Sequence, residues 1–412
     1  MARLGNRLER MWTTVGSMRI RHALALALCA GLAVGCSSGG GGDTSTTTTQ
    51  SAQSSSTTTS AQTEQSRPPL PGFGGSAVCG PAFLNALTQR EKLAQLLTVG
   101  VTGTADALDI VESEGIGGIF IGSWTDESML ANGEIPQVTE ASAIPLMVTI
   151  DEEGGRVSRV DELFGPDPSA REVARTMTPD QTYQMALDRG RELRGLGITV
   201  NFAPDVDVSS QPDGAVIGDR SFSDDPDVVT EYAEAYARGM REAGILPVLK
   251  HFPGHGSASG DSHTGAVTTP PLDQLQTSDL VPYRNLVDTE VGVMLGHLSV
   301  PGLTTDGLPA SLSPEAVSLL REGAGYDAPP FTGPIFTDDL SGMKAITDRY
   351  DIAQAVEQAL KSGVTVALWL TTDDVPRVLD HLEQAVSSGR LPIAQVDSSV
   401  LTLARAKGAV TC

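Results

Sequence analysis

The segment ILPVLKHFPGHGSASGDSHTG, residues 245–265, begins as an apolar β-type run and continues as a glycine-rich loop with one lysine, three histidines and one aspartate. Similar short runs recur along the chain and alternate with longer segments of helical period, which is typical of a parallel sheet built from βα units. Polar residues follow several of these runs at their carboxyl ends, where barrel enzymes place their sites. The pattern therefore favours an α/β fold of the (β/α)8 TIM barrel type; a doubly wound sheet is the alternative.

Eight runs are predicted to be strands, at residues 96–100, 117–121, 146–151, 198–202, 245–250, 291–295, 334–338 and 364–370. Between them, amphipathic segments such as residues 178–197 and 225–244 begin with Thr or Asp followed by Pro and end with Gly, as helices do. Thr88 and Glu91 form a capping-box pattern before the first of these helices. The alternations occupy about 330 residues, which suits one barrel without a second domain.

The amino-terminal region has the layout of a bacterial export signal. Arg19 and Arg21 precede an apolar run that is too short for a transmembrane helix and ends LAVGC at Cys36. This ending resembles a lipobox, so residues 1–35 are predicted to be a lipoprotein-type signal peptide and Cys36 the lipidated residue. Ordinary cleavage with a free Cys36 is the alternative, and Met18 is a plausible start. We expect export and anchoring by lipid on the outer face of the cytoplasmic membrane, the cell wall side.

Residues 36–78 follow as a spacer rich in Ser, Thr and Gly, too poor in apolar residues to fold. The folded domain is predicted to span residues 79–412 and is bracketed by Cys79 and Cys412, which could form a disulfide or remain two thiols. The 51 acidic and 28 basic residues of the 412-residue chain give a formal net charge of -23, which disfavours a nucleic-acid partner.

Two segments carry the first candidate site residues. In residues 250–265, Asp261 stands two positions before His263 and can orient its imidazole for proton transfer. A metal site made of His251, His255, Asp261 and His263 is the rival interpretation, but the spacing matches no common metal motif, so neither a metal nor a cofactor is predicted. The segment PIFTDDLSG, residues 334–342, delivers Asp338 and Asp339 to a strand end, where Asp339 could cap a helix.

Two segments beside neighbouring strands add carboxylates and guanidinium groups that suit the binding of sugar hydroxyls. IDEEGGRVSR, residues 150–159, contributes Asp151, Arg156 and Arg159. NFAPDVDV and IGDRSFSDDP, residues 201–208 and 217–226, contribute Asp207 and Arg220.

In this order the motifs resemble family 3 glycoside hydrolases, and the KHFPGHG segment with a trailing DSH resembles their β-N-acetylglucosaminidase branch over about residues 87–408. The resemblance implies a single catalytic barrel domain with Asp338 as nucleophile, His263 as general acid/base and Asp261 as its orienting partner. It also implies sugar-binding roles, which fall on Asp151, Arg159, Arg220, Lys250 and His251. Glu152 departs from the usual form of its motif, at a position expected to be peripheral. Many members carry a second α/β domain, whereas this sequence stops at Cys412, so any role of that domain in substrate binding is expected to be met otherwise or lost.

The function implied is a retaining exo-β-N-acetylglucosaminidase that removes terminal N-acetylglucosamine from peptidoglycan fragments by double displacement. The expected partners are a carbohydrate substrate of the muropeptide class and, through the lipid anchor alone, the membrane. Phosphorolysis of the same bond is an alternative, because an imidazole base does not repel phosphate as a carboxylate would. A non-catalytic sugar-binding lipoprotein is another, although aromatic residues make up only 4% of the chain.

Overall fold

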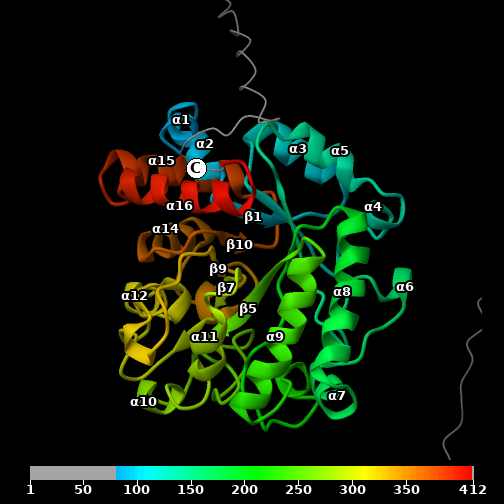
Figure 1. Cartoon of the computed structure of the whole chain (residues 1–412). Coiled ribbons are helices and arrows are strands. Elements are labelled where there is room, and N and C mark those ends of the chain that lie inside the picture. Colours follow the sequence, from blue (N-terminus) through cyan, green and yellow to red (C-terminus); the bar gives the residue numbers. More distant parts are fainter. Residues whose placement is uncertain (1–79, 411–412) are drawn as a thin grey trace, which may run out of the picture. The chain divides into compact units, whose positions relative to one another are not determined.

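The computed structural model describes residues 80–410, and its centre is a parallel eight-stranded sheet in the order β10-β1-β2-β3-β4-β5-β7-β9 (Figure 1). Phe336 of β9 forms a parallel bridge with Val366, the residue before β10. The amide of Thr337 also donates to the carbonyl of Val366 at 3.0 Å, so the two ends of the sheet meet and close a barrel. This confirms the predicted (β/α)8 barrel rather than the doubly wound alternative.

All eight predicted strands are present, each a little shorter or shifted by one or two residues. The barrel strands are β1 Leu97–Gly100, β2 Gly118–Ile121, β3 Met147–Ile150, β4 Val200–Asn201, β5 Leu246–Phe252, β7 Gly292–Leu295, β9 Ile335–Thr337 and β10 Ala367–Trp369. Two short strands were not predicted, β6 Val267–Thr268 and β8 Leu298–Ser299, which pair with each other beside the barrel.

The helices begin and end where the sequence signals indicate. Thr178 caps the long helix α8 with a capping box that includes Gln181, Pro179 occupies its first turn, and Gly197 ends it in the left-handed conformation at φ 94°. Thr88 and Glu91 form the predicted capping box of α2. In Figure 1, α8 and α9 run side by side along the outside of the barrel.

The α-helices are α1 Gly80–Asn85, α2 Gln89–Ala94, α3 Thr104–Glu114, α4 Ser128–Ala131, α5 Ile135–Ala141, α6 Asp161–Phe164, α7 Ala170–Thr176, α8 Pro179–Leu196, α9 Pro226–Glu242, α10 Leu272–Leu275, α11 Leu280–Leu286, α12 Pro314–Glu322, α13 Lys344–Thr347, α14 Ile352–Ser362, α15 Val375–Ser387 and α16 Ile393–Ala406. The 3₁₀ helices are η1 Gly218–Arg220, η2 Ala310–Leu312 and η3 Ala324–Tyr326.

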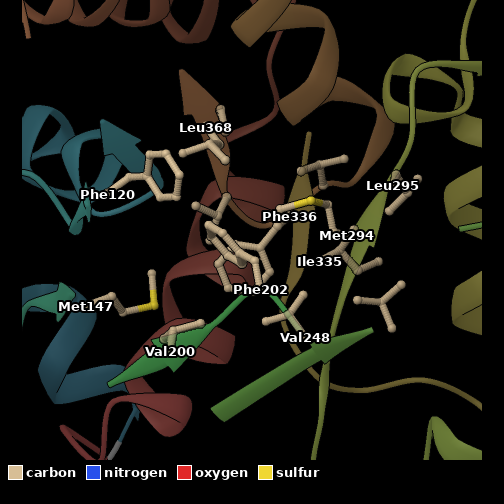
Figure 2. Packing of buried hydrophobic residues seen from close by; sticks show 14 of the residues in the cluster. Phe120, Met147, Val200, Phe202, Val248, Met294, Leu295, Ile335, Phe336 and Leu368 are labelled. Carbon is tan, nitrogen blue, oxygen red and sulfur yellow. The ribbon is translucent and has the colours of Figure 1, made fainter. Parts of the chain in front are cut away.

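Apolar side chains from different strands fill the interior of the barrel (Figure 2). The ring of Phe202, the residue after β4, lies 5.8 Å from that of Phe120 in β2 and 5.3 Å from that of Phe336 in β9, measured between centroids, so aromatic contacts cross the interior. Because the interior is packed, any pocket for a substrate has to lie beyond the strand ends.

Several predictions fall on residues outside the described part of the chain, among them the signal peptide, the lipidated Cys36, the spacer and the pairing of Cys79 with Cys412. Within residues 80–410, none of the helices has the length and apolar character that crossing a membrane requires.

Candidate active site

A cavity of about 290 Å³ lies beyond the carboxyl ends of the barrel strands. Seven of the eight predicted site residues line it, and these are Asp151, Arg159, Arg220, Lys250, His251, His263 and Asp338. The eighth, Asp261, is hydrogen-bonded to His263. Residues that follow β3, β5 and β9 thus come together although up to 187 positions separate Asp151 from Asp338 in the sequence.

A buried ion network joins the loop after β3 to strand β5. The ammonium of Lys250 lies 2.7 Å from Asp151 and 2.6 Å from Glu153, and Arg220 donates to both carboxylate oxygens of Glu153 at 2.8 Å. Burial alone would raise the pKa of Glu153, but Arg220 and Lys250 outweigh it and keep that pKa low. Each of these charges therefore has a partner of opposite sign, and the four side chains hold one another in fixed orientations. Sequence reasoning did not single out Glu153.

Strand β5 presents two consecutive residues, Lys250 and His251, to the same cavity. In a regular strand, neighbouring side chains point to opposite faces. Here the register between β5 and β7 shifts between Leu249 and Phe252, an irregularity of the kind that redirects side chains next to active sites.

Asp207 supports His251 from behind the cavity. Its carboxylate lies 2.8 Å from Nδ1 of His251 and accepts a hydrogen bond from the backbone amide of His255 at 2.6 Å. Burial opposes the charge of Asp207, but the charge and hydrogen bond of His251 lower its pKa to about 2. Burial likewise opposes the charge of His251, and Asp207 raises its pKa. The pairing therefore favours the charged form of both side chains, and it fixes the imidazole in one orientation.

Asp338 follows β9, and its backbone amide donates to the carbonyl of Leu295 in β7 at 3.1 Å. Burial raises its pKa, but electrostatic interactions with His251 and His297 outweigh burial and lower it, which favours the ionised carboxylate. His297 is itself buried, between the hydroxyl of Ser311 and the carbonyl of Asp339. Sequence reasoning missed this histidine, because nothing in its local sequence indicates its long-range partners.

Asp339 has a different role from its neighbour. Its carboxylate accepts hydrogen bonds from the amides of Ser341 and Gly342, at 2.8 and 2.7 Å, and from the Ser341 hydroxyl. The prediction that Asp339 caps a helix is wrong, because the next helix, α13, begins only at Lys344 and Asp339 instead holds the intervening turn.

Asp261 and His263 lie on the glycine-rich loop after β5. Oδ1 of Asp261 is 2.7 Å from Nδ1 of His263, which leaves Nε2 of the ring for proton exchange. The His263 side chain is 62% exposed, whereas Lys250 and Glu153 of the buried ion network are 3% and 5% exposed. Ser262 attaches the loop to the segment after Asp338. Its carbonyl accepts a hydrogen bond from the amide of Ala345 at 3.1 Å, and the Ser262 hydroxyl lies 3.3 Å from the sulfur of Met343.

The four residues of the rival metal hypothesis do not form a set of ligands. Among the described residues, one group of three potential ligands lies close enough to share an ion, and it consists of Asp205, Asp207 and His251. Of the rival set it includes only His251, whose Nδ1 is engaged with Asp207.

Two residues of the loop after β3 hold the architecture rather than line the cavity. Glu152, expected to be peripheral to the site, does not line the cavity, but it is 1% exposed and accepts hydrogen bonds from the Ser158 hydroxyl and the Arg159 amide, so its role is structural. Arg156 donates to Asp219 and to carbonyls in the loop after β4. Both positions stabilise the segment that carries Arg159.

Residues 88–406 match the sequence model of a protein family, described as glycosyl hydrolase family 3 N terminal domain. The chain belongs to glycoside hydrolase family 3. Within the family it is 58% identical to β-hexosaminidase LpqI of Mycobacterium tuberculosis over 331 residues, which are 80% of this chain and 85% of that protein. It is a β-hexosaminidase, and its substrate is a carbohydrate; the alternative of a non-catalytic binding protein is set aside.

Solved structures of the family agree with this assignment. A family 3 glycosyl hydrolase from Mycobacterium smegmatis superimposes with a TM-score of 0.78 at 59% identity, covering 80% of this chain and 99% of that one. A family 3 β-N-acetylglucosaminidase from a Paenibacillus species gives a TM-score of 0.72 at 30% identity, covering 78% and 63%.

Proposed function

We propose that the chain is a retaining exo-β-N-acetylglucosaminidase in which Asp338 is the nucleophile and His263 the general acid/base. The observation that carries this proposal is that an ionised carboxylate and an imidazole with a free Nε2 line one cavity, on segments joined through Ser262 and Ala345. A nucleophile must be charged to attack, whereas its partner must exchange a proton.

In the first step, Asp338 attacks C1 of the terminal sugar while Nε2 of His263 gives its proton to the glycosidic oxygen, which leaves with the aglycone. In the second step, water gives a proton to the same nitrogen and attacks C1, and the bond to Asp338 breaks. Two inversions leave the β configuration unchanged. Asp261 acts on His263 alone, by holding the tautomer that is protonated at Nδ1.

The hydroxyls of the terminal sugar are proposed to bind the polar wall formed by Asp151, Arg159, Arg220, Lys250 and His251. Arg159 lines the cavity, and the hydrogen bond from its Nη1 to the carbonyl of Ser158 orients the guanidinium there, which supports a role in donating to a substrate oxygen. The other four are already oriented by the ion network and by Asp207, so little side-chain entropy is lost on binding.

The proposed substrates are peptidoglycan fragments that end in N-acetylglucosamine, reached by export. The proposed export route requires a signal peptide at residues 1–35, a lipidated Cys36 and a spacer to residue 78 ahead of the barrel domain of residues 79–412. The enzyme then lies on the cell wall side of the membrane.

Incorporation of labelled palmitate into the wild type but not into Cys36→Ser tests the anchor. Equal labelling of both proteins would reject it.

The test of the function is hydrolysis of an aryl N-acetyl-β-glucosaminide by wild type, Asp338→Ala and His263→Ala. His381→Ala is a matched control, since His381 also pairs with a carboxylate, Glu357, at 2.6 Å but lies outside the cavity. We expect β-N-acetylglucosamine as the first product by NMR. Formation of a sugar 1-phosphate in phosphate buffer would identify phosphorolysis instead, and an active Asp338→Ala would reject the mechanism.

The substrate class is tested separately with a disaccharide of N-acetylglucosamine and N-acetylmuramic acid beside chitobiose. Release of N-acetylglucosamine from both supports peptidoglycan fragments as substrates. Cleavage of chitobiose alone would reject them.

A further inference from the structure

Trp124 lies in the turn after β2 and is 42% exposed, the largest exposed fraction among the bulky apolar side chains of residues 80–410. It lines the same cavity as Asp338 and His263. The other tryptophan of this part of the chain, Trp369, is fully buried. A tryptophan left exposed beside a catalytic cavity loses apolar contact with the protein, which points to a ligand that covers it.

The indole of Trp124 is held in place by the residues at the ends of β1 and β2. A Cβ at Gly100 would come within 2.7 Å of the ring, and a Cβ at Gly122 within 2.4 Å, so two glycines make room for it. Phe120 packs against it with centroids 5.8 Å apart. The turn is fixed by Thr125, whose hydroxyl accepts from the amide of Gly122 at 3.0 Å and donates to the carbonyl of Val101 at 2.7 Å.

Trp124 follows β2, the neighbour of β3 in the sheet, but its indole lies over Gly100 at the end of β1, on the side of β2 that is away from β3. The polar wall comes from β5 and from the segments after β3 and β4, whereas Asp338 follows β9. Around the closed barrel, β9 is followed by β10 and β1, and the indole lies over Gly100 at the end of β1, near Leu370 after β10. A sugar whose hydroxyls reach the polar wall and whose C1 lies at Asp338 directs its leaving group toward this side.

We propose that Trp124 is the platform of a +1 subsite, on which the pyranose ring of the aglycone, a hexosamine, stacks its C–H face. This inference rests on the proposed function. An aromatic ring offers a large rigid apolar surface at low entropic cost, and the sugar keeps its hydroxyls in water while its less polar face covers the indole. Trp124 touches neither the reacting bond nor the terminal sugar in this arrangement.

The experiment compares two substrates with the same terminal sugar, chitobiose and N-acetylglucosaminyl β-fluoride. Fluoride has no ring to place on Trp124. We expect Trp124→Ala to lower kcat/KM on chitobiose by about 30-fold, the effect of losing a well-packed aromatic contact. On the fluoride we expect a change of about twofold or less, since uniform binding to the terminal sugar is untouched. Trp124→Phe should recover most of the activity on chitobiose.

Phe164→Ala is the matched control, because Phe164 is 41% exposed but does not line the cavity, and it should leave both substrates unchanged. Equal losses on both substrates in Trp124→Ala would mean contact with the terminal sugar, and no loss on either would mean no contact at all; both overturn the proposal.

A second measurement separates this proposal from the proposed function. Titration of chitobiose into Asp338→Ala, with and without Trp124→Ala, measures binding in the absence of turnover. Weaker binding without Trp124 supports the subsite even if the assigned mechanism fails, and equal binding overturns it. Conversely, an active Asp338→Ala rejects the mechanism, and the comparison of chitobiose with the fluoride then tests the subsite in its place.

Discussion

Two regions of the cavity use the same kinds of side chain in opposite surroundings. At the strand ends, Lys250 and Glu153 are 3% and 5% exposed and pair within a buried network. On the loop after β5, Asp261 and His263 are 33% and 62% exposed and pair only with each other. The first region holds paired, buried charges, whereas the second holds the proposed general acid/base, a group that has to gain and lose a proton.

The difference indicates that the strand-end network contributes to stability, whereas the loop pair contributes little. A buried charge without its partner is costly, so the strand-end network couples binding to the stability of the barrel. An exposed pair contributes little to stability, so the loop can be tuned for proton transfer without risk to the fold. Substitutions at the two regions should therefore separate activity from stability.

The largest effect is expected for Asp338→Ala, which removes the proposed nucleophile at a strand end. We expect kcat/KM to fall on the order of 10⁴-fold or more, because no covalent intermediate can form. Asp306→Ala, an exposed aspartate outside the cavity, is the control and should remain fully active. Rescue of Asp338→Ala by azide with an α-glycosyl azide as product would support the assignment further.

His263→Ala is expected to lose about 10²- to 10⁴-fold in kcat on disaccharides, the usual contribution of a general acid. The loss should be smaller for a nitrophenyl leaving group, which needs less protonation. Because His263 is exposed, the urea midpoint should not move. A large drop in that midpoint would contradict the separation of the two regions.

Glu153→Gln should destabilise the barrel by roughly 3–5 kcal/mol, as expected when one partner of a buried ion pair is removed. Lys250 and Arg220 would each lose a compensating charge. Urea unfolding gives the free energy, and activity is expected to fall together with it. Unchanged stability would show that Asp151 and Asp205 suffice to balance the two cations.

Asp279 lies between the two regions, because its side chain packs against Gly254 where the loop leaves β5. Its titration should therefore affect stability. Burial raises its pKa to about 7, above the unfolded value of about 4. The folded form then holds a proton that the unfolded chain releases, so stability falls as pH rises from about 4 to about 7, by at most about 4 kcal/mol. Asp279→Asn should flatten this slope in urea titrations at pH 5 and pH 8; an unchanged slope would exclude Asp279 as its source.

The smallest effect is expected for Asp261→Asn. Loss of the carboxylate leaves His263 less well oriented, and we expect kcat to fall about tenfold, within the usual share of an orienting group. Stability should change by less than about 1 kcal/mol, as for other exposed ion pairs. A loss as large as that of His263→Ala would give Asp261 a more direct part in proton transfer.

Much of the site was predictable because its residues follow predicted strands, and parallel strands end on one side of a barrel. Asp338, His263 and Lys250 were singled out in this way, and all three line the cavity. Glu153, His297 and Trp124 were not, because their importance lies in partners far along the chain. Glu153 stands beside two other acidic residues in DEEGG, and only its contacts with Arg220 and Lys250 distinguish it.

The sequence by itself determined the eight strands, the capped helices between them and the segments that reach the cavity, because local periodicity and turn chemistry specify these features. The tertiary structure decided which carboxylates are charged and which are structural. Asp338 and Asp339 are neighbours with the same side chain. Two nearby histidines lower the pKa of Asp338, whereas Asp339 accepts the hydrogen bonds that hold a turn. It also decided that Lys250 and His251 face one cavity, through the shifted register of β5. Charge and direction depend on what lies nearby in space, and the barrel brings those neighbours together only once it has closed.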